Sequence, residues 1–367
     1  MELTASCLFG TEGLVADELR YMGFGSVEAA TGQVRFEGGP AEIVKANLRL
    51  RTAERVMIKL GEFPAKTFDM LFEGVKALPW EDYIEKSGAF PVRGSSLDSA
   101  LHSVPDCQRI IKKAAAVRLA AKYGLTRLPE DGAVHQIRFA IMRDVASIYL
   151  DTSGEGLHKR GWRPNSNLAP LRETLAAAIV KLSRFKGREI FIDPFCGSGT
   201  IAIEAALAAI NRAPGLNRSF AAESWPMCPK ALWSEAREEA RAAEYSGGYT
   251  ILASDIDPAC IETAKANAKR AGVDGIVRFK TADALTLPIP EGPGILAANP
   301  PYGERLLTPQ EVQKLYSSMG RAWKGLDRWK QYYLTNNPEF EKYFGKKATK
   351  RRKLYNGMIP CNLYMYF

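Results

Sequence analysis

Residues 188–206 read "REIFIDPFCGSGTIAIEAA", and this stretch decides the fold. The apolar run 190–192 predicts a buried strand, expected over 189–193, and the small-residue turn Gly197-Ser198-Gly199 predicts a helix over 200–211. Glycine lets the backbone approach a ligand closely, and a helix N-terminus offers free N–H groups. Because open α/β sheets bind nucleotides at the carboxyl ends of their strands, this turn predicts a nucleotide site.

The same stretch speaks against two common nucleotide sites. A dinucleotide fingerprint needs a third glycine, but Gly199 is followed by residues 200–202, Thr-Ile-Ala. A P-loop is excluded, because no Gly-Lys-Ser/Thr follows the turn. The carboxylate of Asp193 instead favours a cationic or hydroxyl-rich ligand. An adenosyl sulfonium cofactor, with its amino-acid tail and its ribose, has both properties.

Two further strand patterns end in aspartates. "ILASDIDP" places Asp255 at the end of a strand, where it could accept both ribose hydroxyls, and Asp257 before the helix expected over 258–271. Asp257 followed by proline is also a good helix N-cap, and both interpretations can hold. "VRFKTADA" places Asp283 after the next strand, where it could accept from an adenine amine. These strand ends, following the glycine turn in order, strengthen the prediction of a nucleotide site.

The stretch "ANPPYGER", residues 298–305, comes directly after the strand pattern "GILAA". Two adjacent prolines end a strand and rigidify the next residues, so the sequence could encode no more than a rigid turn. Its position behind the glycine turn and the acidic strand ends indicates instead that it belongs to the same site.

Residues 1–160 alternate between strand and helix patterns without a cluster of acids, bases or nucleophiles. The β-α-β-β-α order of the first 60 residues predicts a ferredoxin-like unit with a hairpin turn at Thr31-Gly32. A second unit combines a strand at 89–96, a helix ending at Gly124, and a hairpin turning at Arg143-Asp144. Both are interpreted as binding or scaffold modules.

Charge is placed unevenly. Residues 1–160 hold 21 Lys and Arg against 21 Asp and Glu, whereas residues 161–367 hold 29 against 20, so the entire net charge of +9 lies in the second part. It includes "KKATKRRK" at 346–353, predicted as a basic loop between two terminal strands. Such a concentration indicates a polyanionic partner, although a solvated basic loop is the alternative.

Composition excludes several other classes. No apolar run approaches the ~20 residues of a membrane span, and the first residues show no export signal, so a cytoplasmic protein without a membrane partner is expected. The six cysteines are scattered without a C-x-x-C pair, so no metal site is predicted. Cys196 could be a nucleophile, but we interpret it as a small residue of the turn. Trp162 and Arg163 could contact RNA or pack the linker.

The motifs "DPFCGSGT", "SDIDP", "TADA" and "NPPYGERL" resemble those of S-adenosylmethionine-dependent class I methyltransferases that act on exocyclic amines. "HKRGWR", "APLRETLAAAI" and "APGLNRSF" more closely resemble THUMP-domain guanine-N2 methyltransferases of bacterial 23S rRNA. The resemblance implies a Rossmann-like domain with a seven-stranded, mostly parallel sheet over 161–367, preceded by a ferredoxin-like domain (1–60) and a THUMP RNA-binding domain (61–160), both α+β.

The resemblance also implies the residues of the site. It assigns catalysis to Asn299, Pro300, Pro301 and Tyr302, without a general base. The side-chain oxygen of Asn299 and the carbonyl of Pro300 could hold the hydrogens of an amine, and Tyr302 could stack on an extruded base. S-adenosylmethionine binding falls to Asp193, Pro194, Phe195, Cys196, Gly197, Ser198, Gly199, Thr200, Asp255, Ile256, Asp257, Asp283, Ala284 and Asn299. Two alternatives stay open: an N6-adenine methyltransferase acting on RNA or DNA, and a non-catalytic RNA-binding or ribosome assembly factor.

Overall fold

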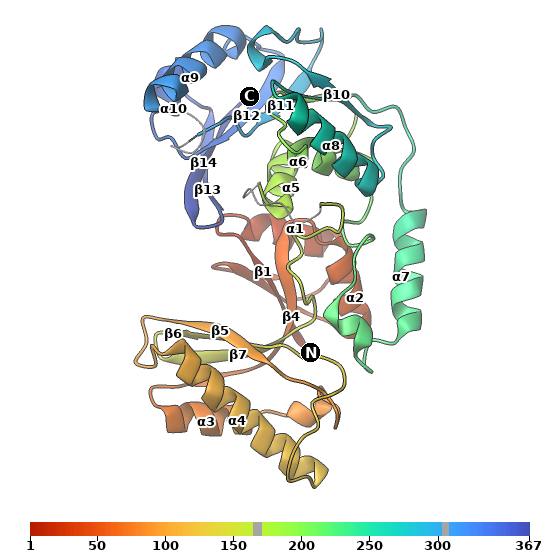
Figure 1. The fold of residues 1–367 in the computed structure, drawn as a ribbon, viewed down its shortest axis with the longest axis vertical. Helices are drawn as coiled ribbons and strands as arrows, with labels where there is room; N and C mark the ends of the chain where they lie inside the picture. Colours follow the sequence, from red (N-terminus) through yellow and green to blue (C-terminus); the bar gives the residue numbers. More distant parts are fainter. Residues whose placement is uncertain (164–170, 303–307) are drawn as a thin grey trace.

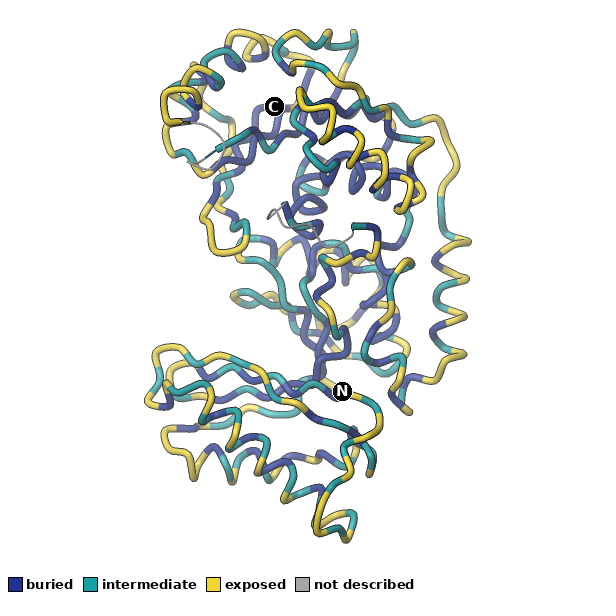
Figure 2. The backbone as a smooth tube through the Cα atoms, in the orientation of Figure 1, coloured by how far each residue is buried: buried dark blue, intermediate teal, exposed yellow. Residues whose placement is uncertain are grey.

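The computed structural model describes residues 1–163, 171–302 and 308–367. Its strands form two seven-stranded sheets, one from each half of the chain, which lie one after the other along the long axis of the molecule (Figure 1). Buried residues follow the strands of both sheets, whereas the outward faces of the covering helices are exposed (Figure 2).

The first sheet has the order β2-β3-β1-β4-β7-β6-β5. Its strands are β1 (Glu2–Cys7), β2 (Glu28–Ala30), β3 (Gln33–Glu37), β4 (Ala53–Pro64), β5 (Val92–Leu97), β6 (Ile137–Met142) and β7 (Val145–Asp151). Helices α1 (Glu12–Tyr21) and α2 (Pro40–Arg49) pack on its first four strands. Helices α3 (Phe68–Lys76) and α4 (Val104–Tyr123), with the short η1 (Trp80–Asp82), cover the other end.

The long strand β4 joins the two N-terminal units into one sheet. Its first half pairs with β1, where Ile58 lies opposite Leu3, and its second half pairs with β7, where Pro64 lies opposite Val145. The predicted boundary between residues 60 and 61 falls inside this strand. The two units therefore share backbone hydrogen bonds and one apolar core.

Local signals explain several of these elements. The predicted hairpin turn joins β6 to β7, and both Arg143 and Asp144 adopt the left-handed conformation that such a turn needs, with φ of 51° and 63°. Helix α4 ends at Gly124, which is also left-handed, with φ of 65°.

The second sheet has the order β10-β9-β8-β11-β12-β14-β13. Its strands are β8 (Ile190–Asp193), β9 (Ile251–Asp255), β10 (Val277–Thr281), β11 (Gly294–Ala298), β12 (Trp329–Thr335), β13 (Lys350–Asn356) and β14 (Ile359–Tyr366). The first five in spatial order are parallel. Strand β14 is antiparallel to β12, and β13 is antiparallel to β14, so only β14 runs against the other six, which confirms the predicted mostly parallel sheet.

Helices cover both faces of this sheet. One core contains α5 (Glu173–Leu182), α6 (Thr200–Ala209) and α8 (Pro258–Ala271). The other contains α9 (Pro309–Trp323), α10 (Phe340–Phe344) and the short η3 (Ala284–Thr286). The sequence did not predict β13: residues 350–353 of the expected basic loop are part of this edge strand.

The segment 211–249 leaves the second sheet and packs on the first. It contains η2 (Ala221–Ser224) and α7 (Lys230–Ala242), and α7 contacts α2. The Trp225 ring stacks on His135 with ring centroids 4.6 Å apart, and its Nε1 donates to the carbonyl of Val134 at 3.0 Å. Trp225 and Trp233 lie in the core of the N-terminal sheet, so this insertion couples the two halves of the chain.

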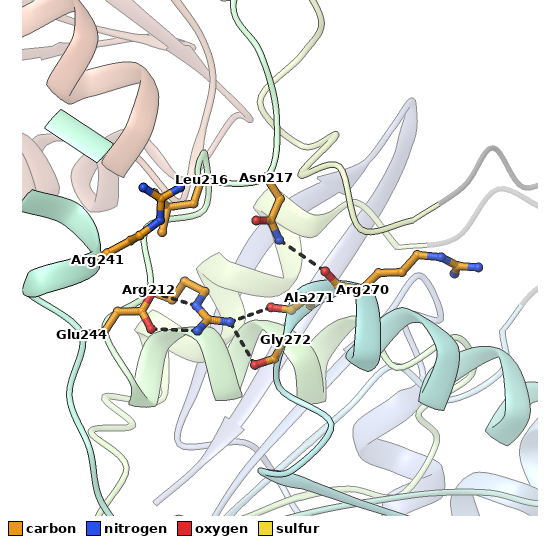
Figure 3. Close-up of a pocket in the computed structure, with 8 residues that line it drawn as sticks. All are labelled: Arg212, Leu216, Asn217, Arg241, Glu244, Arg270, Ala271 and Gly272. Atoms are coloured by element: carbon orange, nitrogen blue, oxygen red, sulfur yellow. Dashed lines mark hydrogen bonds and ion pairs between the residues drawn. The ribbon is translucent and has the colours of Figure 1, made fainter. Parts of the chain in front are cut away.

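One arginine fastens the insertion to helix α8 of the second half of the chain. Arg212 donates to both oxygens of Glu244 at 2.8 Å and to the carbonyls of Ala271 and Gly272 at 2.9 Å (Figure 3). Those carbonyls end helix α8, where a positive charge is favourable. The cavity drawn there is lined by residues that include Arg212, Asn217 and Glu244, whose side chains already form hydrogen bonds within the protein.

Charge pairs, one of them fully buried, also join the two halves. Arg160 and Glu204 of α6 form an ion pair at 3.2 Å, with at most 1% of either side chain exposed. Glu54 of β4 accepts from His158 at 3.1 Å and from Arg172 at 2.8 Å. Burial alone would raise the pKa of Glu54, but the hydrogen bonds from His158 and Thr174 lower it to about 2. The N-terminal sheet is therefore held at a fixed place on α5 and α6.

Candidate active site

The glycine turn lies between β8 and α6, as the sequence predicts. Gly197 and Gly199 adopt φ of 51° and 84°, which disfavour any residue with a Cβ. A Cβ added at Gly199 would also lie 3.0 Å from the Cβ of Ala264 on α8, whereas one at Gly197 would meet no atom within 4 Å. Gly199 therefore allows two helices to approach, and Gly197 leaves open space in front of the backbone.

Asp193 is buried at the end of β8, with 1% of its surface exposed. Its Oδ1 accepts from the backbone N–H of Phe195 at 3.4 Å, and its Oδ2 has no hydrogen-bond partner within residues 1–163, 171–302 and 308–367. Burial, reinforced by the charge of Asp255, raises the pKa of Asp193 to about 8. A buried carboxyl with a free oxygen fits a cationic group of a ligand.

Asp255 lies next to this turn at the end of β9. Its Oδ2 accepts from the N–H of Gly197 at 2.9 Å and its Oδ1 from the N–H of Asp257 at 3.0 Å. Each carboxylate oxygen has a second lone pair, so Asp255 can also accept hydroxyl groups. Asp257 caps α8 by accepting from the N–H of Ala259 at 2.8 Å, and 71% of the Ile256 surface is exposed between the two aspartates.

Asp283 follows β10 on the same edge of the sheet. The N–H of Ala282 donates to the carbonyl of Asp255 at 3.0 Å, which keeps the two strand ends adjacent. The exposed Asp283 caps η3 by accepting from the N–H of Leu285 at 2.9 Å, and Ala284 is buried beneath it. The structure therefore brings together the three strand ends that the sequence singled out.

The Asn-Pro-Pro-Tyr stretch begins where β11 ends, and the described part of it is residues 299–302. The half-buried Asn299 has a side-chain oxygen that is inaccessible to solvent and has no hydrogen-bond partner in the described part of the chain. Tyr316 of α9 donates to the carbonyl of Pro301 at 3.3 Å and contacts the hydroxyl of Thr335 at 2.8 Å. No pattern in the sequence signals this brace, because Tyr316 reads as one of the apolar residues of its helix.

Tyr302 is held at its hydroxyl from the terminal hairpin. Asn356 of β13 donates to the Tyr302 hydroxyl at 3.2 Å, and the Sγ of Cys361 lies 3.9 Å from it. Burial, with the neighbouring Cys361, raises the pKa of Tyr302 above its usual value, so the phenol stays protonated. The ring is therefore fixed by its surroundings rather than acting as a base.

Three other residues singled out from the sequence, Cys196, Trp162 and Arg163, have structural rather than chemical roles. Burial, followed by the charge of Asp193, raises the pKa of the Cys196 thiol, which disfavours the thiolate that a nucleophile needs. Trp162 is buried. Arg163 donates to the hydroxyl of Thr200 at 2.6 Å and pairs with Glu173 at 3.4 Å, so it supports the start of α6.

Two negative findings concern the described residues. They contain no group of three or more His, Cys, Asp or Glu side chains that could hold a metal ion. Their helices include none that is both long and apolar enough to cross a bilayer.

Three family models match the chain. Residues 2–57 match the RlmL ferredoxin-like domain, residues 65–151 the THUMP domain, and residues 160–365 the RMKL-like methyltransferase domain. These matches confirm the resemblance inferred from the motifs.

Known proteins match over the whole chain. YpsC of Bacillus subtilis (strain 168), named as a candidate RNA methyltransferase, is 46% identical over 100% of this chain and 95% of its own. The crystal structure of SMU.472 complexed with SAH is 41% identical, with a TM-score of 0.95 over 100% of this chain and 97% of that one. A protein from Listeria monocytogenes str. 4b F2365, named as a predicted N6-adenine-specific DNA methylase, is 45% identical, with a TM-score of 0.94 over 100% and 96% of the two chains.

Proposed function

We propose that this chain, which belongs to the RMKL-like methyltransferases with an RlmL-like ferredoxin domain and a THUMP domain, methylates the N2 amine of a guanine in RNA. The family makes it an S-adenosylmethionine-dependent RNA methyltransferase, and the guanine amine and 23S rRNA, naked or in an assembly intermediate, are the finer proposal. Two observations support that choice. Residues 2–57 match the RlmL ferredoxin-like domain, and the motifs of the second half of the chain resemble those of guanine-N2 methyltransferases.

The residues at the carboxyl edge fit the proposed cofactor. Asp193 would offer the ammonium group a buried oxygen that is unpartnered within the described residues, and Asp255 would offer lone pairs to the ribose hydroxyls. Asp283 and the exposed Ile256 would receive the adenine, and residues 194–200 would cradle the amino-acid tail beside the N-terminus of α6. When bound, S-adenosylmethionine supplies an electrophilic methyl group on sulfur.

The catalytic loop would act on the amine of the target base. An exocyclic amine is a weak nucleophile, because its lone pair is delocalised into the ring. The Asn299 side-chain oxygen and the Pro300 carbonyl would accept its two hydrogens and favour a pyramidal nitrogen aimed at the methyl group. The nitrogen–methyl bond forms as the sulfur–methyl bond breaks, and the amine then releases one proton to water. Tyr302 would stack on the extruded base.

The side-chain oxygen of Asn299, which has no hydrogen-bond partner among the residues that the structure describes, carries this proposal. A side-chain amide oxygen that is shielded from water and unpaired is costly, and an amine donor from the substrate would satisfy it. The Pro300-Pro301 pair and the Tyr316 hydrogen bond keep this loop in place without using that oxygen.

A second candidate is methylation of an adenine N6 amine. The Listeria protein named for that activity on DNA supports it, and the same four loop residues could serve either amine. The THUMP match favours RNA over DNA for this chain.

Asn299→Ala tests the role of the loop. With methyl-labelled cofactor and hypomethylated total RNA, we expect labelling to be lost while SAH binding, measured by calorimetry, is nearly unchanged. Asn299→Asp keeps an acceptor oxygen at the same position and should retain part of the activity. Full turnover by Asn299→Ala would refute the assigned role.

A further inference from the structure

Strand β13 carries four consecutive basic residues, Lys350, Arg351, Arg352 and Lys353. Arg352 is half-buried and the other three are exposed. Arg351 pairs with Glu341 of α10 at 3.7 Å, and the Nζ of Lys353 lies 5.6 Å from the centre of the Tyr355 ring. In the described part of the chain Lys350, Arg352 and Lys353 form no ion pair, so their charges are free for a partner.

The strand alternates these four residues between its two faces. Lys350 and Arg352 share a face with Leu354 and Asn356, whereas Arg351 and Lys353 lie on the opposite face. Leu354 is buried in the core that includes α5 and α6, which fixes the orientation of the strand. Lys350 and Arg352 therefore lie on the same face of the strand as Asn356, whose side chain contacts Tyr302.

The strand ends at the proposed base-stacking ring. Asn356 is its last residue and donates to the Tyr302 hydroxyl at 3.2 Å. At about 3.3 Å per residue, Arg352 lies about 13 Å from Asn356 along the strand and Lys350 about 20 Å. The two basic side chains and the catalytic loop are therefore spread along the strand over a distance that a few nucleotides of RNA can span.

The turn after β13 adds an apolar group at the same place. Gly357 adopts the left-handed conformation, with φ of 65°, and Met358 is 95% exposed beside it. An exposed apolar side chain next to a base site can stack against or wedge between neighbouring bases.

A basic edge strand has a simpler explanation, which is protection against pairing with another sheet. Close packing already restricts part of this edge: a Cβ at Gly10 would lie 2.5 Å from the carbonyl of Lys353, and Phe9 packs edge-on against Tyr355 at 5.8 Å. Protection of the edge would require basic residues on either face of the strand equally. The hydrogen bond from Asn356 to Tyr302 makes the two faces different, because only the face of Asn356 leads to the catalytic loop.

We propose that β13 binds the single-stranded RNA next to the target nucleotide, with backbone phosphates on Lys350 and Arg352 and a base against Met358. The target base then reaches the catalytic loop where Asn356, at the end of β13, contacts Tyr302. This inference rests on RNA being the substrate, as proposed above, and adds the surface by which the catalytic half holds it.

Two double variants test it with equal changes in charge. Lys350→Ala/Arg352→Ala removes two positive charges from the face of Asn356, and Arg351→Ala/Lys353→Ala removes two from the opposite face. Binding of a large-subunit rRNA transcript and of a single-stranded oligonucleotide is measured by fluorescence anisotropy over a range of salt concentrations. Calorimetry with SAH and thermal unfolding show that both variants keep the fold and the cofactor site.

The first variant should bind at least about tenfold more weakly, and its slope of log K against log salt should fall by up to about 1.4, because a single strand contributes about 0.7 per phosphate contact. The second variant should bind nearly as the parent protein does. Equal losses in both variants, or no loss in either, would overturn the proposal. If the parent protein methylates RNA but the first variant binds RNA normally, the proposed function stands. That result would refute only the role of β13 in RNA binding.

Discussion

Replacing Asp193 by asparagine probes the cofactor site through its effect on stability. Burial raises the pKa of Asp193 from the ordinary 3.8 to about 8. Between about pH 4 and pH 8 the folded protein therefore retains a proton that the unfolded chain releases. The free energy of unfolding should fall as the pH rises through this window: the stabilisation from the protonated carboxyl is complete below about pH 4 and lost above about pH 8.

The size of the effect is set by the same pKa. One pH unit corresponds to about 1.36 kcal/mol, so the change from 3.8 to about 8 sets an upper limit of about 6 kcal/mol across the window. Water entering around the charged carboxylate will reduce it. Even about 2 kcal/mol would lower the melting temperature by roughly 4–8 °C, by the scale of domains somewhat smaller than this chain.

Thermal unfolding of both proteins from pH 5 to pH 8.5 measures this. Asp193→Asn cannot ionise, so its melting temperature should rise relative to the parent protein as the pH increases. The affinity for SAH gives a second readout: in the parent protein it should increase from pH 6 toward pH 8, because an ammonium partner must displace the proton. A melting-temperature difference that is constant over the pH range would refute the reasoning.

Three further predictions concern the base-stacking ring, the glycine turn and a buried ion pair. Tyr302→Phe keeps the ring and should lose little activity, whereas Tyr302→Ala should lose about 1–3 kcal/mol of base binding, measured as a rise in the apparent KM for RNA; equal effects would argue against stacking. Gly199→Ala combines an unfavourable φ with the close contact on α8 and should weaken SAH binding and stability more than Gly197→Ala, which has only the unfavourable φ; similar losses by calorimetry would contradict this. Arg160→Met leaves Glu204 buried without its partner and should destabilise by about 3–5 kcal/mol in urea unfolding, more than the double variant Arg160→Met/Glu204→Leu; a double variant that is no more stable would show that the charge is not the cause.

Local signals in the sequence predict the parts of the site that lie within one strand–turn–helix unit. The glycine turn, the cap at Asp257 and the order of the acidic strand ends depend on residues close together in the chain. The structure agrees with the sequence here, because positive φ angles and N-caps have few chemical solutions.

Contacts between distant segments could not be predicted. Strand β4 pairs with β7, about 90 residues away, and no local pattern encodes that register. Trp225 reads as part of an insertion in the catalytic half but packs in the N-terminal core. Strand β13 escapes prediction because Leu354 is its one fully buried side chain, so its four basic residues give no apolar alternation. The supports Tyr316 and Asn356 depend on the fold that brings α9 and β13 to the loop.

The most direct test of the proposed reaction is to identify the methylated nucleoside. The protein is incubated with methyl-labelled S-adenosylmethionine and hypomethylated total RNA, the RNA is digested, and the labelled nucleoside is separated and identified. Our account predicts N2-methylguanosine from large-subunit rRNA. N6-methyladenosine would assign the adenine amine instead, and an absence of label would contradict catalysis by this loop.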